Sequence, residues 1–119
     1  MYKRLQPILF VEDLKSEVEF YQKLGFQLEH EEVGFVGLAY QDHLLFGLQQ
    51  QAGSIFHETQ PLIWQIATDH IESVYQHCQQ AQFKLCKELE LQPWGEWLFG
   101  VLSPNGYQVL FEGTKNEID

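Results

Sequence analysis

The sequence is poor in basic side chains, and the few it has are not clustered. Of its 119 residues, 7 are Lys or Arg against 17 Asp or Glu, and the long stretch between Lys23 and Lys84 contains neither Lys nor Arg. Proteins that bind nucleic acid contact its phosphates with clustered basic side chains. The composition therefore argues against nucleic acid as a partner.

Cysteines are also scarce, and long apolar runs are absent. Cys78 and Cys86 fall in a predicted helix and a predicted strand, which favours reduced structural thiols over a disulfide or a metal-binding pair. The apolar stretch after Lys3 and Arg4 has only the length of a strand and stops at Glu12. Because this stretch resembles neither a signal peptide nor a membrane span, we expect a cytoplasmic protein with no membrane partner.

The excess of acidic side chains leaves a formal net charge of −10. A charge of this sign steers cationic ligands toward a protein. It also favours solubility, and on composition alone solubility is the simpler explanation.

One structural unit occurs twice in the chain. Residues 6–31 space their apolar positions as strand, helix and strand, and residues 63–88 do so again. Subtracting 6 from 63 gives an offset of 57, which pairs identical or similar residues, and the pairs that begin with Leu14, Phe26 and Leu28 fall at positions expected to face the core. The pairs are Leu9 with Ile66, Leu14 with Ile71, Ser16 with Ser73, Phe26 with Phe83, Leu28 with Leu85 and Glu31 with Glu88. Two copies imply pseudo-symmetry within one domain, not a solenoid.

Periodicity and turn residues predict eight strands and two helices. The first helix, capped by Asp13 or Glu12, is expected to end at Gly25, and the second is expected to be capped by Asp69. The expected buried stripes are Leu14, Val18, Tyr21 and Leu24 in the first helix, and Ile71, Val74, Tyr75 and Cys78 in the second. The expected strands are about 5–11, 26–32, 35–41, 44–49, 62–68, 83–91, 94–102 and 107–112, and the expected helices are about 13–24 and 70–81.

This order gives an α+β fold of two tandem βαβββ modules, each with one helix against a mixed four-stranded sheet. The modules cover about 5–49 and 62–113, joined by the linker 50–61, within a single domain. Each sheet is expected to curl so that the face away from its helix lines a cavity. By alternation, the residues on that face are Gln6, Ile8, Phe10, Ile63, Gln65, Ala67, Gln108, Leu110 and Glu112.

The duplication and three short motifs resemble the vicinal oxygen chelate superfamily, which includes glyoxalase I, extradiol dioxygenases, fosfomycin-resistance thiol transferases and bleomycin-resistance proteins. The motifs are VEDL at 11–14, FY at 20–21 followed by LGF at 24–26, and SPNGY at 103–107. The resemblance covers roughly residues 5–113. It implies the fold strongly and the chemistry weakly, because one fold hosts many functions.

The resemblance implies four metal-ligand positions, one on each of four strands, which fall on Gln6, Gly47, Ile63 and Leu110. Three of these residues cannot ligate a metal, and a catalytic divalent metal needs about three protein ligands. A two-residue shift on the last strand would add Glu112, which still leaves only two candidates. We therefore expect no metal, no cofactor and no catalytic residue, and an enzymatic activity is left open but not favoured.

The resemblance is then closest to the metal-free bleomycin-resistance branch, whose acidic homodimers sequester cationic, aromatic antibiotics. Trp94, Glu96 and Trp97 place aromatic rings beside a carboxylate, and such rings offer flat surfaces for stacking. Alternation puts Trp94 and Glu96 on one face and Trp97 on the other, and the face with Glu96 is expected to be open because a buried unpaired carboxylate is costly. The candidate ligand-binding residues are Trp94, Glu96, Trp97, Gln6, Gln65, Gln108, Glu112 and Tyr40, although the face of Tyr40, like those of Phe35, Phe46 and Phe56, is undecided.

Two functions of different classes remain. The first is a metal-free homodimer that binds a small cationic aromatic molecule such as a bleomycin-like antibiotic. The alternative is a metal-dependent lyase, isomerase or dioxygenase that uses a relocated ligand set drawn from Gln6, Glu112 and a histidine. The aromatic and glutamine residues also have simpler roles, as core residues or as partners of one another and of water.

Overall fold

The computed structural model describes residues 1–41, 44–51 and 60–115. The chain forms two compact units, residues 1–55 and 56–119, which we call the first and second modules and describe separately. Asp42 and His43 between the expected strands 35–41 and 44–49, Phe56 with most of the linker, and the last residues of the chain lie outside the described residues.

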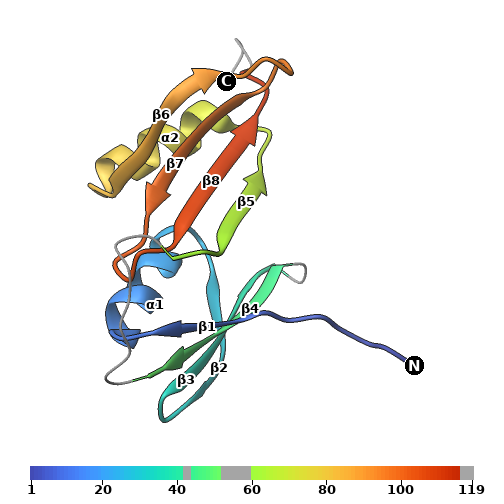
Figure 1. The fold of residues 1–119 in the computed structure, drawn as a ribbon, viewed down its shortest axis with the longest axis vertical. Helices are drawn as coiled ribbons and strands as arrows, with labels where there is room; N and C mark the ends of the chain where they lie inside the picture. Colours follow the sequence, from blue (N-terminus) through green and yellow to red (C-terminus); the bar gives the residue numbers. More distant parts are fainter. Residues whose placement is uncertain (42–43, 52–59, 116–119) are drawn as a thin grey trace. The chain divides into compact units, whose positions relative to one another are not determined.

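The first module contains β1 (Ile8–Val11), α1 (Leu14–Lys23), β2 (Gln27–Glu32), β3 (Phe35–Tyr40) and β4 (Leu44–Gln50). Its sheet has the order β1-β4-β3-β2, in which β1 runs parallel to β4 and the other pairs are antiparallel (Figure 1).

The second module contains β5 (Ile63–Ala67), α2 (Ile71–Gln80), β6 (Lys84–Leu91), β7 (Trp97–Leu102) and β8 (Gln108–Gly113). Its sheet has the corresponding order β5-β8-β7-β6, again with one parallel pair, β5 and β8. The predicted α+β fold of two βαβββ modules is therefore confirmed.

Two strands begin later than the sequence predicts. β1 begins at Ile8, because Pro7 has no N–H to donate and enters the sheet only through its carbonyl, which accepts from the Gly47 N–H at 2.9 Å. The first few residues of the chain, before Gln6, extend away from the sheet (Figure 1). β7 begins at Trp97 instead of Trp94, because residues 93–95 form a tight turn.

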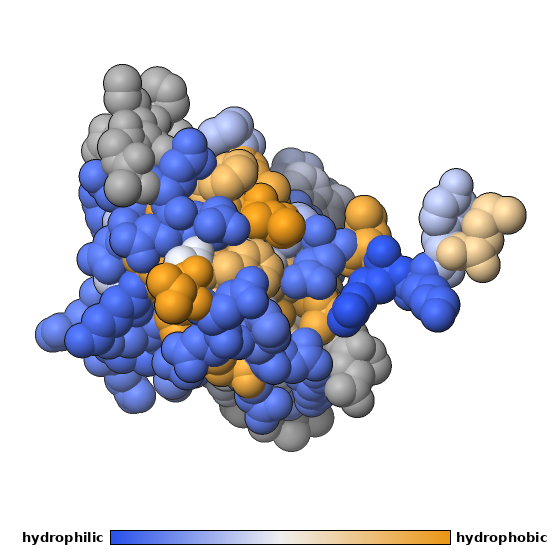
Figure 2. Space-filling view, turned by 90° about the horizontal axis from the view of Figure 1, so that it is seen from below, coloured by the Kyte–Doolittle hydropathy of each residue, from blue (hydrophilic) through white to orange (hydrophobic). Residues whose placement is uncertain are grey.

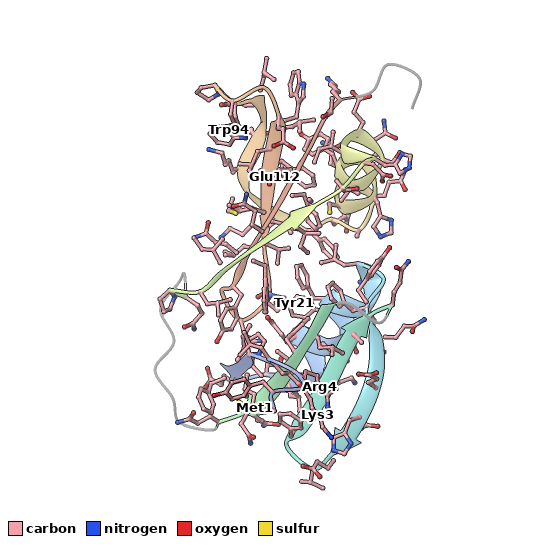
Figure 3. All side chains as sticks on the ribbon, turned by 90° about the vertical axis from the view of Figure 1, so that its right-hand side faces the viewer. Met1, Lys3, Arg4, Tyr21, Trp94 and Glu112 are labelled. Atoms are coloured by element: carbon pink, nitrogen blue, oxygen red, sulfur yellow. The ribbon has the colours of Figure 1, made fainter. Side chains whose placement is uncertain are left out.

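Each helix covers one face of its own sheet. In the first module the Tyr21 ring of α1 (Figure 3) meets the Phe46 ring of β4 edge-on, with 4.8 Å between centroids. In the second module the Tyr75 ring of α2 meets the Phe99 ring of β7 at 5.0 Å. The buried residues on these helix-covered faces are Leu9, Val11, Val36, Leu38, Phe46, Leu48, Phe99, Val101, Val109 and Phe111.

The predicted buried stripe of α1 is correct at Tyr21 but wrong at Leu14 and Val18. Glu17, Phe20 and Tyr21 are buried, whereas Leu14 and Val18 are only half-buried. The aromatic residues determine this orientation, because the Tyr21 ring contacts the rings of Phe20, Phe26 and Phe46. In α2, Ile71 and Cys78 are buried as predicted, and Val74 and Tyr75 are half-buried.

The two helices begin differently. The Asp13 carboxylate caps α1 by accepting from the Ser16 N–H at 3.2 Å. The predicted Asp69 cap on α2 is wrong: the N-cap residue is His70, which makes no side-chain capping hydrogen bond. The His70 N–H instead donates to the Thr68 hydroxyl at 3.1 Å. Because α2 begins at Ile71, Asp69 lies one residue before the N-cap position.

The two helices end alike. After α1, the Phe26 N–H donates to the Tyr21 carbonyl at 3.0 Å, and Gly25 lies between them with φ of 104°. After α2, the Phe83 N–H donates to the Cys78 carbonyl at 3.1 Å, but the left-handed position is held by Gln82 with φ of 60°. This is the helix-ending motif in which glycine is normally preferred.

Replacing Gln82 by glycine is expected to raise the free energy of unfolding by about 0.5–1 kcal/mol, because the left-handed conformation strains any residue with a Cβ. Urea unfolding measures the change. Gln76→Gly, the same substitution inside α2, is the control and should lower stability by about 1 kcal/mol. A loss of stability in both variants would contradict the assignment of strain to Gln82.

The outer antiparallel strand of each sheet carries an irregularity at the same place in the repeat. The register shifts between Leu28 and His30 on β2, and between Leu85 and Lys87 on β6. The residues in the shifts, Glu29 and Cys86, are related by the repeat offset of 57. The duplicated unit therefore includes a bulged edge strand.

No helix within the described ranges is long and apolar enough to cross a membrane.

Candidate functional site

The face of the first sheet away from α1, which we call the first open face, carries exposed apolar residues. Ile8 and Phe10 alternate with the buried Leu9 and Val11 and are 54% and 50% exposed. Apolar side chains lie exposed among hydrophilic ones on the surface that Figure 2 views. Ile8 and Phe10 therefore give this face exposed apolar surface.

Gln6 lies on this face beside a glycine that makes room for an aromatic ring. A Cβ on Gly47 would lie 2.7 Å from the Phe35 ring and 3.6 Å from the Gln6 amide nitrogen. Because no side chain projects at Gly47, Phe35 lies across β4 next to Gln6. The sequence left Phe35 undecided, and the signal that could have placed it is a glycine in the middle of an apolar strand.

The corresponding face of the second sheet, the second open face, brings together three of the predicted glutamine and glutamate residues. On the parallel strands β5 and β8, Ile63 pairs with Gln108, Gln65 with Leu110, and Ala67 with Glu112. These residues alternate with Val109 and Phe111, which are buried on the helix side. The predicted alternation of the second module is therefore correct at these strands.

The second open face also contains a thiol, that of Cys86, which was not among the residues predicted from the sequence. The Cys86 thiol donates to the Gln108 side-chain oxygen across 3.8 Å, and it reaches the second open face because it lies at the β6 bulge. Partial burial raises the pKa of Cys86, with opposing contributions from its own backbone and from Lys87. The thiol form of Cys86 can donate this hydrogen bond, which a thiolate cannot.

The other cysteine belongs to the core. Cys78 is fully buried on α2, and burial raises the pKa of its thiol to about 11. This residue is structural, as the sequence predicted.

Trp94 and Glu96 precede β7, so strand alternation does not decide which way they point. Residues 93–95 form a three-residue hairpin loop between Gln92 and Glu96, in which the Gly95 N–H donates to the Gln92 carbonyl at 2.9 Å and the Gln92 N–H to the Glu96 carbonyl at 2.8 Å. Trp94 is 60% exposed at this turn (Figure 3), and Glu96 is half-buried. The prediction that both extend the open face of a strand is wrong.

Trp97 lies on the helix side of the sheet, on the face of Phe99 and Val101. The Lys115 ammonium lies 4.2 Å from the centroid of the Trp97 ring and 3.1 Å from the Glu72 carboxylate on α2. The Trp97 ring is therefore already in contact with a cation of its own chain.

Tyr40 lies on the helix-covered face of the first sheet. Its ring is 5.7 Å from that of Phe26, and its neighbours by alternation on β3 are Leu38 and Val36. It does not share the first open face with Gln6. Of the eight candidates, four therefore lie on open faces: Gln6 in the first module, and Gln65, Gln108 and Glu112 in the second.

The donor set does not fit a metal at the positions that the family resemblance implies. Gln6 and Gly47 lie side by side in the first module, and Ile63 and Leu110 lie on one face of β5 and β8 in the second. Only Gln6 carries a donor atom, whereas a catalytic divalent metal needs about three protein ligands. Among residues 1–41, 44–51 and 60–115, no three His, Cys, Asp or Glu side chains gather closely enough to hold an ion.

A protein-family model described as the Glyoxalase/Bleomycin resistance protein/Dioxygenase superfamily matches residues 4–111. A search of curated proteins by sequence gave no match.

Solved structures match nearly the whole chain. A bleomycin-binding protein complexed with bleomycin is 20% identical, with a TM-score of 0.74, and the alignment covers 96% of this chain and 100% of that one. A bleomycin resistance determinant encoded on transposon Tn5 is also 20% identical, with a TM-score of 0.77 and coverage of 97% and 100%. A glyoxalase/bleomycin resistance protein/dioxygenase from Nocardioides is 16% identical, with a TM-score of 0.79 and coverage of 98% and 88%. At these identities the likeness concerns the fold.

Proposed function

Since this chain belongs to the glyoxalase/bleomycin resistance protein/dioxygenase superfamily, we propose that it binds a small cationic aromatic molecule, without a metal, and acts by sequestering it. A bleomycin-type glycopeptide is the first ligand to test, because two proteins of the same fold are described as binding bleomycin or conferring resistance to it.

The observation that carries the proposal is the composition of the second open face. Ile63 is 48% exposed there beside Gln65, Gln108 and Leu110, with the Glu112 carboxylate at the end of the row. Apolar and amide groups suit the body of an organic ligand, and one carboxylate suits its positive charge. The net charge of −10 would favour the approach of such a ligand.

The proposed chemistry is binding and not catalysis. The family positions for metal ligands hold Gly47, Ile63 and Leu110, and the Cys86 thiol on the second open face has a raised pKa. These groups offer hydrogen bonds and apolar contact to a ligand, but neither a Lewis acid nor an activated nucleophile.

The test is a tryptophan-fluorescence titration with a bleomycin-type glycopeptide, on chelator-treated protein and again with a divalent metal added. We expect saturable quenching at one ligand per chain that does not depend on the metal. Glu112→Gln should weaken binding about tenfold, because a charge-assisted hydrogen bond is lost.

The matched control is Asp69→Asn, which makes the same change at an exposed carboxylate outside both open faces. It should bind as the unaltered protein does. Binding or turnover that requires the metal would contradict the proposal and favour the alternative, a lyase, isomerase or dioxygenase with a relocated ligand set. If the Glu112→Gln variant bound the glycopeptide with unchanged affinity, the second open face would not be the binding site.

We further propose that the protein is cytoplasmic and that it works as a homodimer, the dimer being what the resemblance implies. Sedimentation equilibrium should then give twice the chain mass of 14.0 kDa. A mass equal to that of one chain at all concentrations would contradict the dimer.

A further inference from the structure

The first module contains a hollow on its helix side, away from the first open face. It has a volume of about 360 Å³ and lies between α1 and the sheet, with Leu14, Val18 and Val36 contributing apolar surface and Glu19, Glu31 and Lys15 contributing charged groups. Volumes of a few hundred Å³ are typical of small-molecule sites. The hollow exists because Leu14 and Val18, only half-buried, do not fill the space beside the sheet.

The repeat identifies the equivalent place in the second module. The offset of 57 relates Val18 to Tyr75 and Glu31 to Glu88. For the later strands the registers give an offset of 63, since Val36 pairs with Leu48 as Phe99 pairs with Phe111. Val36 therefore corresponds to Phe99, and two valines in the first module stand where the second module has two aromatic rings.

In the second module these rings and the glutamate contact one another. The Tyr75 ring meets the Phe99 ring edge-on at 5.0 Å, and the Tyr75 hydroxyl donates to the Glu88 carboxylate at 3.4 Å. Partial burial, and then the charge and hydrogen bond of Glu88, raise the pKa of Tyr75. The hydroxyl is protonated at neutral pH, as in any tyrosine, and can therefore donate to this carboxylate. The second module thus shows what complements this location: an aromatic ring with a donor directed at the glutamate.

We propose that the hollow of the first module is a binding site for a small aromatic ring carrying a cationic donor, an arylalkylammonium, with its ring beside Val18 and Val36 and its ammonium group on Glu31. The site is separate from the open faces and does not depend on the ligand proposed for them.

The charge of the hollow selects a cation over a neutral phenol. Glu19 and Glu31 both line it against a single ammonium group, that of Lys15. Within the described ranges neither carboxylate has an ion-pair partner. A ligand ammonium would supply the charge-assisted hydrogen bond to Glu31 that the Tyr75 hydroxyl supplies to Glu88 in uncharged form.

The test uses 2-phenylethylammonium as the probe and follows the methyl signals of Leu14, Val18 and Val36 by NMR. We expect saturable shifts at these methyls. The anion 3-phenylpropanoate, which keeps the ring, and n-butylammonium, which keeps only the charge, should each bind at least tenfold more weakly. Glu31→Gln should weaken binding of 2-phenylethylammonium about tenfold.

The decisive variant is Val18→Tyr, which copies Tyr75 into the first module. It should fill the hollow, raise the melting temperature and abolish binding of the probe. Val33→Tyr adds the same ring at a fully exposed position in the β2–β3 turn and should bind the probe as the unaltered protein does. Val18→Tyr should also titrate normally with the bleomycin-type glycopeptide, which separates this site from the one on the second open face.

Three results would overturn the proposal: no shift at the three methyl groups, equal binding of the anionic analogue, or unchanged probe binding by Val18→Tyr. If Val18→Tyr does not fold, the comparison of Glu31→Gln with Val33→Tyr decides, because equal affinities in those two variants would exclude Glu31 from the site.

Discussion

Phe99→Ala is expected to lower the free energy of unfolding by about 3–5 kcal/mol, the usual cost of deleting a fully buried phenylalanine ring. Phe99 has no exposed surface, stacks on Phe111 at 5.2 Å between centroids and meets Tyr75 edge-on. The loss would be a large fraction of the total stability of a small protein, which is about 5–15 kcal/mol. Urea unfolding measures it, provided that the dependence on denaturant is unchanged.

The control for Phe99→Ala is Phe99→Leu, which keeps most of the buried volume and should cost about 1.5 kcal/mol or less. A loss under 1 kcal/mol for Phe99→Ala would contradict the packing of α2 on β7. It would also contradict the Tyr75–Phe99 contact with which the hollow of the first module is compared.

The second large effect is expected at Gly113, the last residue of β8. A Cβ at this position would overlap the backbone carbonyl oxygen of Thr68. A backbone atom cannot turn aside as a side chain can, and the Thr68 N–H is itself bonded to the Glu112 carbonyl at 2.9 Å. Gly113→Ala should therefore separate the ends of β5 and β8 and cost about 2–3 kcal/mol.

Thr114→Ala is the matched control, since the neighbouring residue is exposed and its truncation should change stability by no more than about 0.5 kcal/mol. Gly113→Ala is also expected to weaken ligand binding, because Glu112 lies at the same end of the second open face. If Gly113→Ala changed neither stability nor binding, Gly113 could not lie as close to the Thr68 carbonyl as the structure places it.

The sequence predicted the architecture because its signals are local and occur twice. Alternation at Ile8–Val11 and Gln108–Gly113, together with Gly25 after α1, set the strand faces and the helix end. The predictions of buried residues were wrong where a residue lies in an environment that its type usually avoids. Charged residues are rarely buried, so Glu17 was not placed in the α1 stripe, although it has no exposed surface.

Errors in the candidate site have a different cause. Trp94 has a high strand propensity, and the turn formed by Pro93 and Gly95 overrides it. The position of Cys86 depends on a bulge, and that of Phe35 on an absent side chain at Gly47. The hollow beside Val18 depends on the distance between a helix and a sheet, which no pattern within either element encodes.

The bulged edge strands have a consequence for how the protein behaves in a crowded solution. An unpaired outer strand is a template on which another chain can add a strand, and repeated addition produces fibrils. A bulge interrupts the row of backbone groups that such addition requires, and β2 also carries Glu29, Glu31 and Glu32 along the same stretch. β6 repeats the bulge at Cys86, with Lys84, Lys87, Glu88 and Glu90 around it. β2 and β6 therefore both resist growth by strand addition, and the repeat carries this protection in each copy.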